Sequence, residues 1–230
     1  MQVTEEMIFF AKCTCPNCGK EFEHPEVRSK FVSLEKQDSD FCGYYNNINP
    51  VYYQVAVCKH CGYAYTKSSS SPLGEYEKAA VHSILSNWHR DSHQYGGLRT
   101  LEQAVKSYKL AILCQELRKA KDSVMGSLYL SLAWLYRYQC RQEEETQALQ
   151  RAFEFMKRAY ERETASELKQ ELKLMYVLGD LAYRLGNNNE AVQWFYAVTT
   201  HEGADQYPVF SRMARSRWQE IREEIKQNRE

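Results

Sequence analysis

The 230-residue sequence has no net charge and few of the residues that interrupt regular secondary structure. Lys and Arg together number 30, Asp and Glu together number 30, proline occurs 5 times and glycine 10 times. Residues 1–72 carry seven basic and eight acidic side chains, which gives this part a net charge of −1. The chain therefore lacks the basic surplus that is typical of a general nucleic-acid binder or an anionic-membrane binder.

Long apolar runs and the common catalytic signatures are also missing. No stretch approaches the roughly 18 consecutive apolar residues of a transmembrane helix. The N-terminal residues 1–6 are acidic and precede no long apolar segment, so we expect no secretory signal and a cytoplasmic protein. The sequence contains no phosphate-binding loop, no His-Glu-x-x-His and no Gly-x-Ser-x-Gly. It therefore offers no catalytic motif that would predict an enzyme.

Two Cys-x-x-Cys-Gly motifs are the most informative feature that is present. They read Cys15-Pro16-Asn17-Cys18-Gly19 and Cys58-Lys59-His60-Cys61-Gly62. Two sulfurs at this spacing reach one metal ion, so we predict a structural, four-thiolate Zn²⁺ site formed by Cys15, Cys18, Cys58 and Cys61. Each glycine predicts a turn with positive φ, in which backbone N–H groups can point at the thiolates.

Other thiols and one histidine leave the ligand set open at this point. Cys13, Cys42 or His60 could replace one of the four ligands. A redox dithiol and cysteines that are simply buried are the alternatives to a metal site. Eight cysteines in a reducing compartment favour metal binding over disulfides. His89 and His93 are four residues apart and could share a helix face, but an isolated pair is usually a surface feature.

The composition changes near residue 71. Residues 12–66 are rich in Tyr, Phe and Val, which predicts short strands and loops, including a strand over 51–57. Ser71 followed by Pro72 suits a helix start, and only Pro208 occurs after residue 72. We predict an α+β protein, with a zinc-ribbon-like β domain over 1–71 and an all-α, tetratricopeptide-like stack of helical hairpins over 72–230. The β unit is too small to be stable without metal.

Apolar residues recur at helical spacing in six segments of the second part. These segments begin near Leu101, Met125, Ala148, Leu168, Ala191 and Phe210. Leu178-Gly179, Gly186, Ala191 and Phe195 stand at the relative positions of the tetratricopeptide pattern. Small residues at 179 and 191 would let two helices approach closely with Phe195 beneath them, and Gly186 suits a helix C-terminus. Ala104, Ala148 and Ala191 repeat at intervals of 44 and 43 residues.

A polar and aromatic segment separates the two cysteine pairs. Asp38, Asp40 and Cys42 alternate, so an extended chain would point all three to one side. With Arg28 as a counter-charge, they could form a carboxylate–thiol site or a second cation site. We favour the other interpretation, an aspartate-anchored turn whose aromatic neighbours pack on the helices. Three aromatic residues beside Arg137 and Arg141 could stack on a ligand, but belong more naturally to a helix–helix core: Trp134, Tyr136 and Tyr138.

Four strings of this sequence support a family resemblance. They are Cys15-Pro-Asn-Cys-Gly-Lys-Glu-Phe, Asp38-Ser-Asp-Phe-Cys, Asn49-Pro-Val-Tyr-Tyr and Val57-Cys-Lys-His-Cys-Gly-Tyr. Together they resemble the bacterial family catalogued as domain of unknown function 2225 (DUF2225), and the resemblance spans most of the chain. It implies a bacterial cytoplasmic protein with a cysteine-rich N-terminal segment and a helical, repeat-like remainder. The resemblance implies no activity and no catalytic residues.

Three functions are compatible with these features. We favour a non-enzymatic zinc-binding scaffold or adaptor whose helical repeats bind a protein or peptide partner in a concave groove. A nucleic-acid-binding zinc ribbon is the second possibility, disfavoured by the charge balance. The third is an enzyme or ligand sensor that uses Asp38, Asp40 and Cys42, which requires these side chains to converge in an open cleft. We expect no membrane partner.

Overall fold

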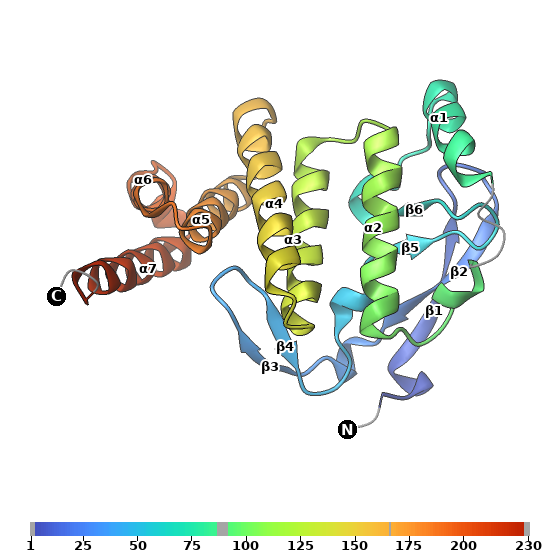
Figure 1. Cartoon of the computed structure of the whole chain (residues 1–230), viewed down its shortest axis with the longest axis horizontal. Helices are drawn as coiled ribbons and strands as arrows, with labels where there is room; N and C mark the ends of the chain where they lie inside the picture. Colours follow the sequence, from blue (N-terminus) through green and yellow to red (C-terminus); the bar gives the residue numbers. More distant parts are fainter. Residues whose placement is uncertain (1–2, 87–91, 166, 228–230) are drawn as a thin grey trace.

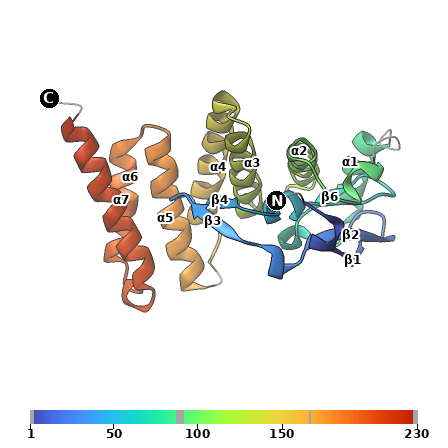
Figure 2. The same ribbon diagram turned by 90° about the horizontal axis from the view of Figure 1, so that it is seen from below.

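The computed structural model describes residues 3–86, 92–165 and 167–227 and has the predicted α+β architecture. Small β hairpins from the N-terminal third occupy one end of an elongated molecule and extend along the helices towards its middle. The helices follow one another along its long axis, and the C-terminus lies at the opposite end (Figures 1 and 2). No helix in the described ranges is both long and apolar enough to cross a membrane.

Three two-stranded antiparallel sheets form in the N-terminal third, and each is a simple hairpin. Strand β1 (Ile8–Thr14) pairs with β2 (Glu21–Val27) in a regular register from Ile8↔Val27 to Thr14↔Glu21. Strand β3 (Leu34–Gln37) pairs with β4 (Gly43–Tyr45). Strand β5 (Ala56–Val57) pairs with β6 (Ala64–Tyr65). The first cysteine motif follows β1, the aspartate segment joins β3 to β4, and the second cysteine motif joins β5 to β6.

Two local predictions in this region are wrong. The expected strand over 51–57 forms only at its end, because residues 50–53 make a 3-10 turn (η3, Pro50–Tyr53) in which the side chain of Asn49 accepts a hydrogen bond from Val51 N at 2.9 Å. The first helix also does not start at Ser71-Pro72. It starts at Glu75, where the backbone N–H of Gly74 donates to the Glu77 carboxylate at 2.7 Å.

Every long segment with apolar residues at helical spacing is a helix. After α1, six longer helices make up the stack. The helices of the described residues are α1 Glu75–Leu85, α2 Leu101–Leu117, α3 Asp122–Tyr138, α4 Gln142–Arg162, α5 Leu168–Arg184, α6 Asn188–Thr200 and α7 Pro208–Gln227. Short 3-10 turns accompany the hairpins and the connections: η1 Glu5–Met7, η2 Ser29–Phe31, η4 Lys67–Ser69, η6 Ser92–Tyr95 and η7 Ala204–Gln206.

Three of the helix–helix turns use the same C-terminal cap. The residue after the C-cap has positive φ in each: Lys119 at 52°, Cys140 at 56° and Gly186 at 82°. The next residue donates its N–H to a carbonyl five positions back, as Asn187 does to Ala182 at 2.8 Å. This pattern satisfies carbonyl groups that a helix end leaves unpaired. Only the glycine makes such a turn readable from sequence, so one of the three was predicted.

The helical pair α5–α6 has the close packing that its small residues predict. A Cβ atom added at Gly179 would lie 2.7 Å from the Phe195 ring, so only glycine permits this approach. The repeating alanines Ala104, Ala148 and Ala191 are all buried in the first half of α2, α4 and α6. The stack of helical hairpins is therefore present, while its assignment as tetratricopeptide-like stays a prediction.

One hydrophobic cluster runs through both parts of the chain. It includes Val55 and Tyr63 next to the second cysteine motif, Tyr108 on α2, and residues as far as Ile221 on α7. A second, small cluster lies under the start of β1 and consists of Met7, Ile8, Ile48 and Tyr53. The domain boundary between residues 71 and 72 stays a prediction, and the apolar core is continuous across it.

Candidate metal centre

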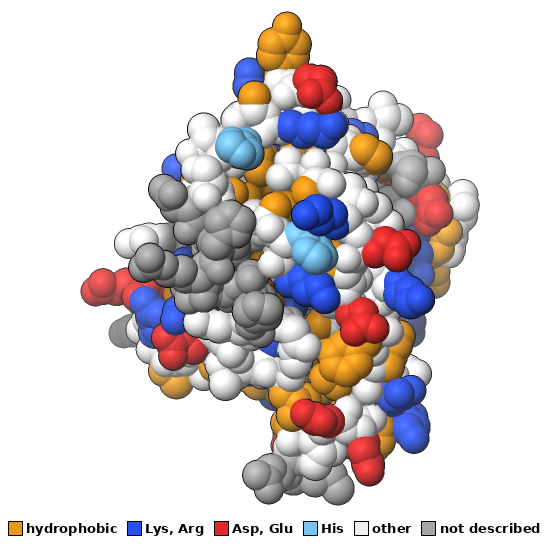
Figure 3. Space-filling model, turned by 90° about the vertical axis from the view of Figure 1, so that its right-hand side faces the viewer, with side chains coloured by type: hydrophobic (Ala, Val, Ile, Leu, Met, Phe, Trp, Pro, Cys, Tyr) orange, Lys and Arg blue, Asp and Glu red, His pale blue; other side chains and the backbone are white. Residues whose placement is uncertain are grey.

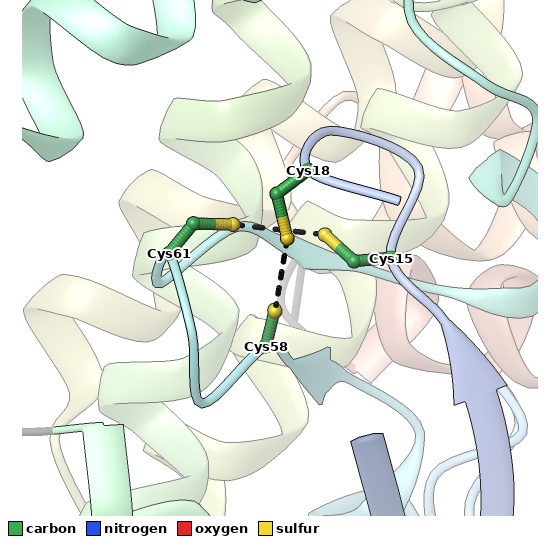
Figure 4. A group of neighbouring side chains, drawn as sticks. All are labelled: Cys15, Cys18, Cys58 and Cys61. Atoms are coloured by element: carbon green, nitrogen blue, oxygen red, sulfur yellow. Dashed lines mark hydrogen bonds between the residues drawn. The ribbon is translucent and has the colours of Figure 1, made fainter. Parts of the chain in front are cut away.

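Two loops bring four cysteine sulfurs together. Cys15 and Cys18 come from the loop after β1, and Cys58 and Cys61 come from the loop between β5 and β6; their side chains point at one another (Figure 4). The Cys15 and Cys61 sulfurs are 3.6 Å apart, and the Cys18 and Cys58 sulfurs are 3.8 Å apart. All four sulfurs lie within 4.8 Å of one another. All four cysteines are free of disulfides.

The backbone of the two loops follows one scheme. Gly19 has φ of 70° and Gly62 has φ of 73°, which confirms the prediction from the motif glycines. Gly19 N donates to Cys15 O at 2.9 Å, and Gly62 N donates to Cys58 O at 2.8 Å. Each first cysteine also donates its N–H across the base of the loop, to Lys20 O or Tyr63 O at 3.0 Å. Two similar turns thus present two sulfurs each to a common point.

The spacing of the sulfurs fits a single tetrahedral ion. A zinc–sulfur bond of about 2.3 Å places the corners of a regular tetrahedron about 3.8 Å apart. The two closest pairs, at 3.6 and 3.8 Å, match this edge, and the remaining pairs need only a small contraction to reach it. The four cysteines could therefore hold a metal ion.

Hydrogen bonds between the sulfurs shift the pKa values of Cys15 and Cys61 in opposite directions. Hydrogen bonds from Cys15 and Cys58 lower the pKa of Cys61 well below its usual range, and Asn17 Nδ2 donates to the same sulfur at 3.6 Å. Hydrogen bonds to Cys58 and Cys61, together with burial, raise the pKa of Cys15 well above its usual range. Because several thiols crowd one point, negative charge gathers there as protons leave. A cation at that point would relieve it.

Helix α2 holds the second loop in place. Gln115 Nε2 donates to Ala64 O at 3.1 Å and to the Tyr63 hydroxyl at 3.2 Å, and the N–H of Ala64 reaches the Cys114 sulfur at 3.4 Å. The first loop has a weaker tether, in which Leu73 N donates to Pro16 O at 3.1 Å. The cluster therefore lies between a loop fixed on the helical stack and a loop at the tip of a separate hairpin.

The other candidate ligands lie elsewhere. The cluster found among the described residues contains neither Cys13 nor Cys42 nor His60. His60 Nε2 contacts Glu21 O at 3.0 Å, and the Cys42 thiol donates to the Tyr138 hydroxyl at 3.4 Å. His89 lies outside the described residues, so the paired-histidine idea stays untested.

The segment 38–42 forms an aspartate-anchored turn, as the favoured interpretation predicts. Cys42 N donates to Asp40 Oδ1 at 3.2 Å, and Phe41 has a φ of 68°, which is rare for a bulky residue. Arg28, considered as a counter-charge for the alternative carboxylate–thiol site, instead donates to Ile8 O at 3.1 Å. Arg137 on α3 takes its place.

Arg137 clamps both carboxylates of this turn. Its Nη2 donates to Asp40 at 2.7 Å, its Nη1 donates to Asp38 at 3.0 Å, and its Nε donates to Glu145 on α4 at 2.7 Å. The Asp40 side chain is fully buried. Although partial burial opposes it, hydrogen bonds from Lys36 and Tyr44 and the charge of Arg137 lower the pKa of Asp38. The carboxylates are thus engaged by the protein itself.

The turn also fits its aromatic residue into the helical stack. Phe41 packs edge-on against Tyr176 of α5, with ring centroids 5.7 Å apart, and Trp134 Nε1 of α3 donates to Asp40 at 3.1 Å. Tyr138 donates to Gly43 O at 2.7 Å, and Arg184 of α5 donates to the Ser39 hydroxyl at 3.0 Å. The β3–β4 hairpin lies along the same helices in Figures 1 and 2. This part of the helical surface is therefore covered by the chain itself.

Sequence reasoning missed two arginines that fix this end of the molecule. Arg137 looked like a neighbour of aromatic residues, not the partner of two aspartates about a hundred positions away. Arg99 is 6% exposed and donates to the carbonyls of Val55 at 2.7 Å and Tyr52 at 3.1 Å, just before the second cysteine loop. Neither an arginine within a helix, such as Arg137, nor one in a loop, such as Arg99, carries a local signal for a distant partner, so nothing in the sequence marks either role.

The comparisons with known proteins agree with the resemblance noted in the sequence. The model of a family described as an uncharacterized protein conserved in bacteria (DUF2225) matches residues 8–221. The chain belongs to this family. No curated protein and no solved structure shows significant similarity to it. The function must therefore be argued from the chemistry of the molecule.

Proposed function

We propose that this protein is a non-enzymatic, zinc-binding adaptor whose helical stack binds a protein or peptide partner. The observation that supports the metal part is the convergence of four sulfurs within 4.8 Å of one another, two pairs of which lie at 3.6 and 3.8 Å, close to the edge length of a tetrahedral zinc site. Four thiolates fill the coordination sphere, so water has no place on the ion. Zinc held in this way is structural in proteins.

The position of the β3–β4 hairpin bears on where a partner could bind the helical stack. Phe41 and the aspartate turn cover the surface of α3 and α5 that faces them, so a peptide cannot lie there without displacing the hairpin. A hollow of about 200 Å³ lies between α6 and α7 and is lined by Phe195, Tyr196 and Trp218 among others. Tyr196 is 65% exposed and Trp218 is 40% exposed. Exposed aromatic residues at a small apolar hollow are typical anchor points for a partner side chain.

The adaptor proposal is tested by affinity capture with the full-length, zinc-loaded protein. We expect a partner that wild type retains and that Trp218→Ser loses. The matched control is Tyr76→Ser on α1, because Tyr76 is 95% exposed and far from α7 along the stack. The partner should be retained equally by wild type and by this control. Capture that is equal for all three proteins, or no capture at all, would count against the proposed surface.

A nucleic-acid-binding role is less well supported. Basic and acidic side chains are interspersed on the face that carries α1 and the β1–β2 hairpin (Figure 3). The net charge of the chain is zero, so no overall field draws a polyanion to it. Retention of labelled RNA or DNA with a steep dependence on salt would favour this alternative over the adaptor.

The enzyme or sensor alternative required Asp38, Asp40 and Cys42 to converge in an open cleft. Asp40 has no exposed surface, and Arg137 and Trp134 bind its carboxylate. Burial raises the pKa of the Cys42 thiol to about 11, which keeps it protonated at neutral pH. A protonated thiol and two engaged carboxylates give no nucleophile or base, so we do not base the proposed function on them.

A further inference from the structure

The hollow between α6 and α7 has the size and lining of a pocket for one apolar side chain. It holds about 200 Å³, which is less than the roughly 300–1,000 Å³ of most small-molecule sites. Its walls include Val192 and Phe195 of α6 and Ala214 of α7, and none of its lining residues is charged. The exposed rings of Tyr196 and Trp218 can pack around an inserted side chain. Both helices lie far along the stack from the β1–β2 hairpin (Figures 1 and 2).

Two arginines stand beside Trp218 on α7. Arg215 comes three residues before Trp218 and Arg222 four residues after it, and side chains at these spacings share a helix face. The guanidinium of Arg222 lies 5.4 Å from the centroid of the Trp218 ring. Both arginines are exposed, and within the described part of the chain neither pairs with a carboxylate. Two cations without an anionic partner thus flank the aromatic rim of the hollow.

Two carboxylates of α7 are engaged on the side of the helix that faces α5. Glu220 forms an ion pair with Arg217, and Arg217 also binds Asp180 of α5 at 2.8 Å. Glu224 accepts a hydrogen bond from the Tyr183 hydroxyl of α5. These acidic groups therefore contact α5 and its partners instead of the free arginines.

The other two acidic residues of these helices are turned away from the hollow as well. Glu190 is the one charged residue in the α6 sequence, and it binds Lys157 of α4 at 2.7 Å. Glu223 is five positions after Trp218, which places it about 140° further around the helix axis. Beside the hollow, the two helices therefore present positive charge that no carboxylate of their own offsets.

We propose that the hollow takes one large apolar side chain of an acidic peptide segment, whose Asp or Glu side chains pair with Arg215 and Arg222. This inference rests on the proposed adaptor function and specifies the chemistry of its partner. Charge complementarity selects an acidic segment, because the unpaired charges at the rim are both positive. A nucleic-acid strand fits less well, because it needs a basic groove that follows its backbone, and here two arginines flank a single small pocket.

Selection from a phage-displayed library of random dodecapeptides tests the proposal on the zinc-loaded full-length protein. We expect the enriched peptides to combine a large apolar residue with Asp or Glu within four positions of it. Their share of Asp and Glu should exceed that of the unselected library. The same peptides should not be enriched on Trp218→Ser, which removes the ring at the rim.

The affinity of a labelled, enriched peptide measures the role of the two arginines by fluorescence anisotropy. Arg215→Gln/Arg222→Gln should weaken binding about fivefold, the effect of losing two exposed ion pairs, and should reduce its dependence on salt. The matched control, Lys119→Gln/Lys121→Gln, removes the same charge at exposed positions in the turn between α2 and α3 and should bind as wild type does. Arg215→Glu/Arg222→Glu should prefer a version of the peptide with Lys in place of Asp and Glu.

The outcomes separate this inference from the adaptor function on which it rests. Enriched peptides that need Trp218 but have no excess of Asp and Glu would overturn the inference and leave the adaptor surface intact. Acidic peptides that bind Trp218→Ser as tightly as wild type would refute the hollow as a binding site, and the adaptor surface with it. The inference also fails if no peptide is enriched, if labelled oligouridylate displaces the peptide, or if wild type forms dimers that Trp218→Ser does not. The last two results would identify nucleic acid or a second copy of the chain as the occupant.

Discussion

Removing one thiolate from the cluster should destabilise the whole molecule, not just its N-terminal third. Cys18 is half-buried and belongs to the first loop, which is tethered only weakly to the helices. Cys18→Ser keeps the size of the side chain but removes the thiolate. The matched control is Cys140→Ser, because Cys140 is exposed in the turn between α3 and α4 and lies outside the cluster.

The expected loss follows from the loop that the ion closes. Cys18 and Cys58 are 40 positions apart, so a metal bridge between them restricts a long loop of the unfolded chain. The chain-entropy relation gives about 4 kcal/mol for a closed loop of about 40 residues. Whole-protein stabilities are about 5–15 kcal/mol, so this is a large share. For a chain of this size, it corresponds to a melting temperature lower by roughly 8–16 °C.

Metal content and thermal unfolding measure the two halves of this prediction. Wild type and Cys140→Ser should each contain one equivalent of zinc, and Cys18→Ser should contain much less. Chelator should lower the melting temperature of wild type towards that of Cys18→Ser. Replacement of zinc by Co²⁺ should give the visible absorption of tetrahedral thiolate coordination.

The same experiment examines the link between the two parts of the chain. Gln115 and Cys114 of α2 bind the second loop. Loss of metal should therefore lower the melting temperature of one cooperative transition, in which the helices unfold together with the N-terminal part. The reasoning is refuted if Cys18→Ser retains a full equivalent of metal, or if metal-free wild type melts at an unchanged temperature. A helical transition that does not move would instead support two independent domains.

Three further predictions concern packing and ionisation. Arg137→Ala leaves the fully buried carboxylate of Asp40 without its closest cation and should lower the free energy of unfolding in urea by about 3–5 kcal/mol. Arg151→Ala removes an exposed ion pair and should lower it by less than about 1 kcal/mol. Equal losses would contradict the role of Arg137 as a clamp. Gly179→Ala places a methyl group 2.7 Å from the buried Phe195 ring of α6 and should lower the free energy of unfolding by about 1–3 kcal/mol. Gly97→Ala meets open space and should be nearly neutral. A neutral Gly179→Ala would mean that α5 and α6 can separate. Burial lowers the pKa of His24 from 6.5 to about 4, so below pH 6.5 the unfolded chain binds a proton that the folded chain does not. Unfolding free energy should therefore fall by up to about 3 kcal/mol between pH 6.5 and 4, and His24→Gln should lack this part of the pH dependence in urea titrations.

The sequence predicted those features that depend on local pattern. The helices follow from apolar residues at steps of three and four, and the cysteine loops follow from paired thiols with a glycine that accepts positive φ. The close contact at Gly179 was predictable for the same reason, because a small residue facing a large one defines a packing site.

Long-range partnerships were not predictable. The alternation of Asp38 and Asp40 suggested one open site, but both carboxylates bind Arg137, about a hundred residues away. The choice among candidate arginines depended on tertiary packing, and Arg28 was the nearest arginine in sequence. The helical turns at Lys119 and Cys140 were likewise hidden, since neither residue favours positive φ.

The covered surface of α3 and α5 also changes how a partner could use the helical stack. The β3–β4 hairpin is held there by Arg137, which also binds Glu145 of α4, and by Phe41 against Tyr176 of α5. One arginine thus joins the turn to two helices at once, so a competing peptide would have to replace an ion-pair network and an aromatic contact together. A binding surface that costs no such exchange is preferable on energetic grounds. For this reason, the hollow between α6 and α7 is a better place for a partner than the concave groove expected of a helical repeat.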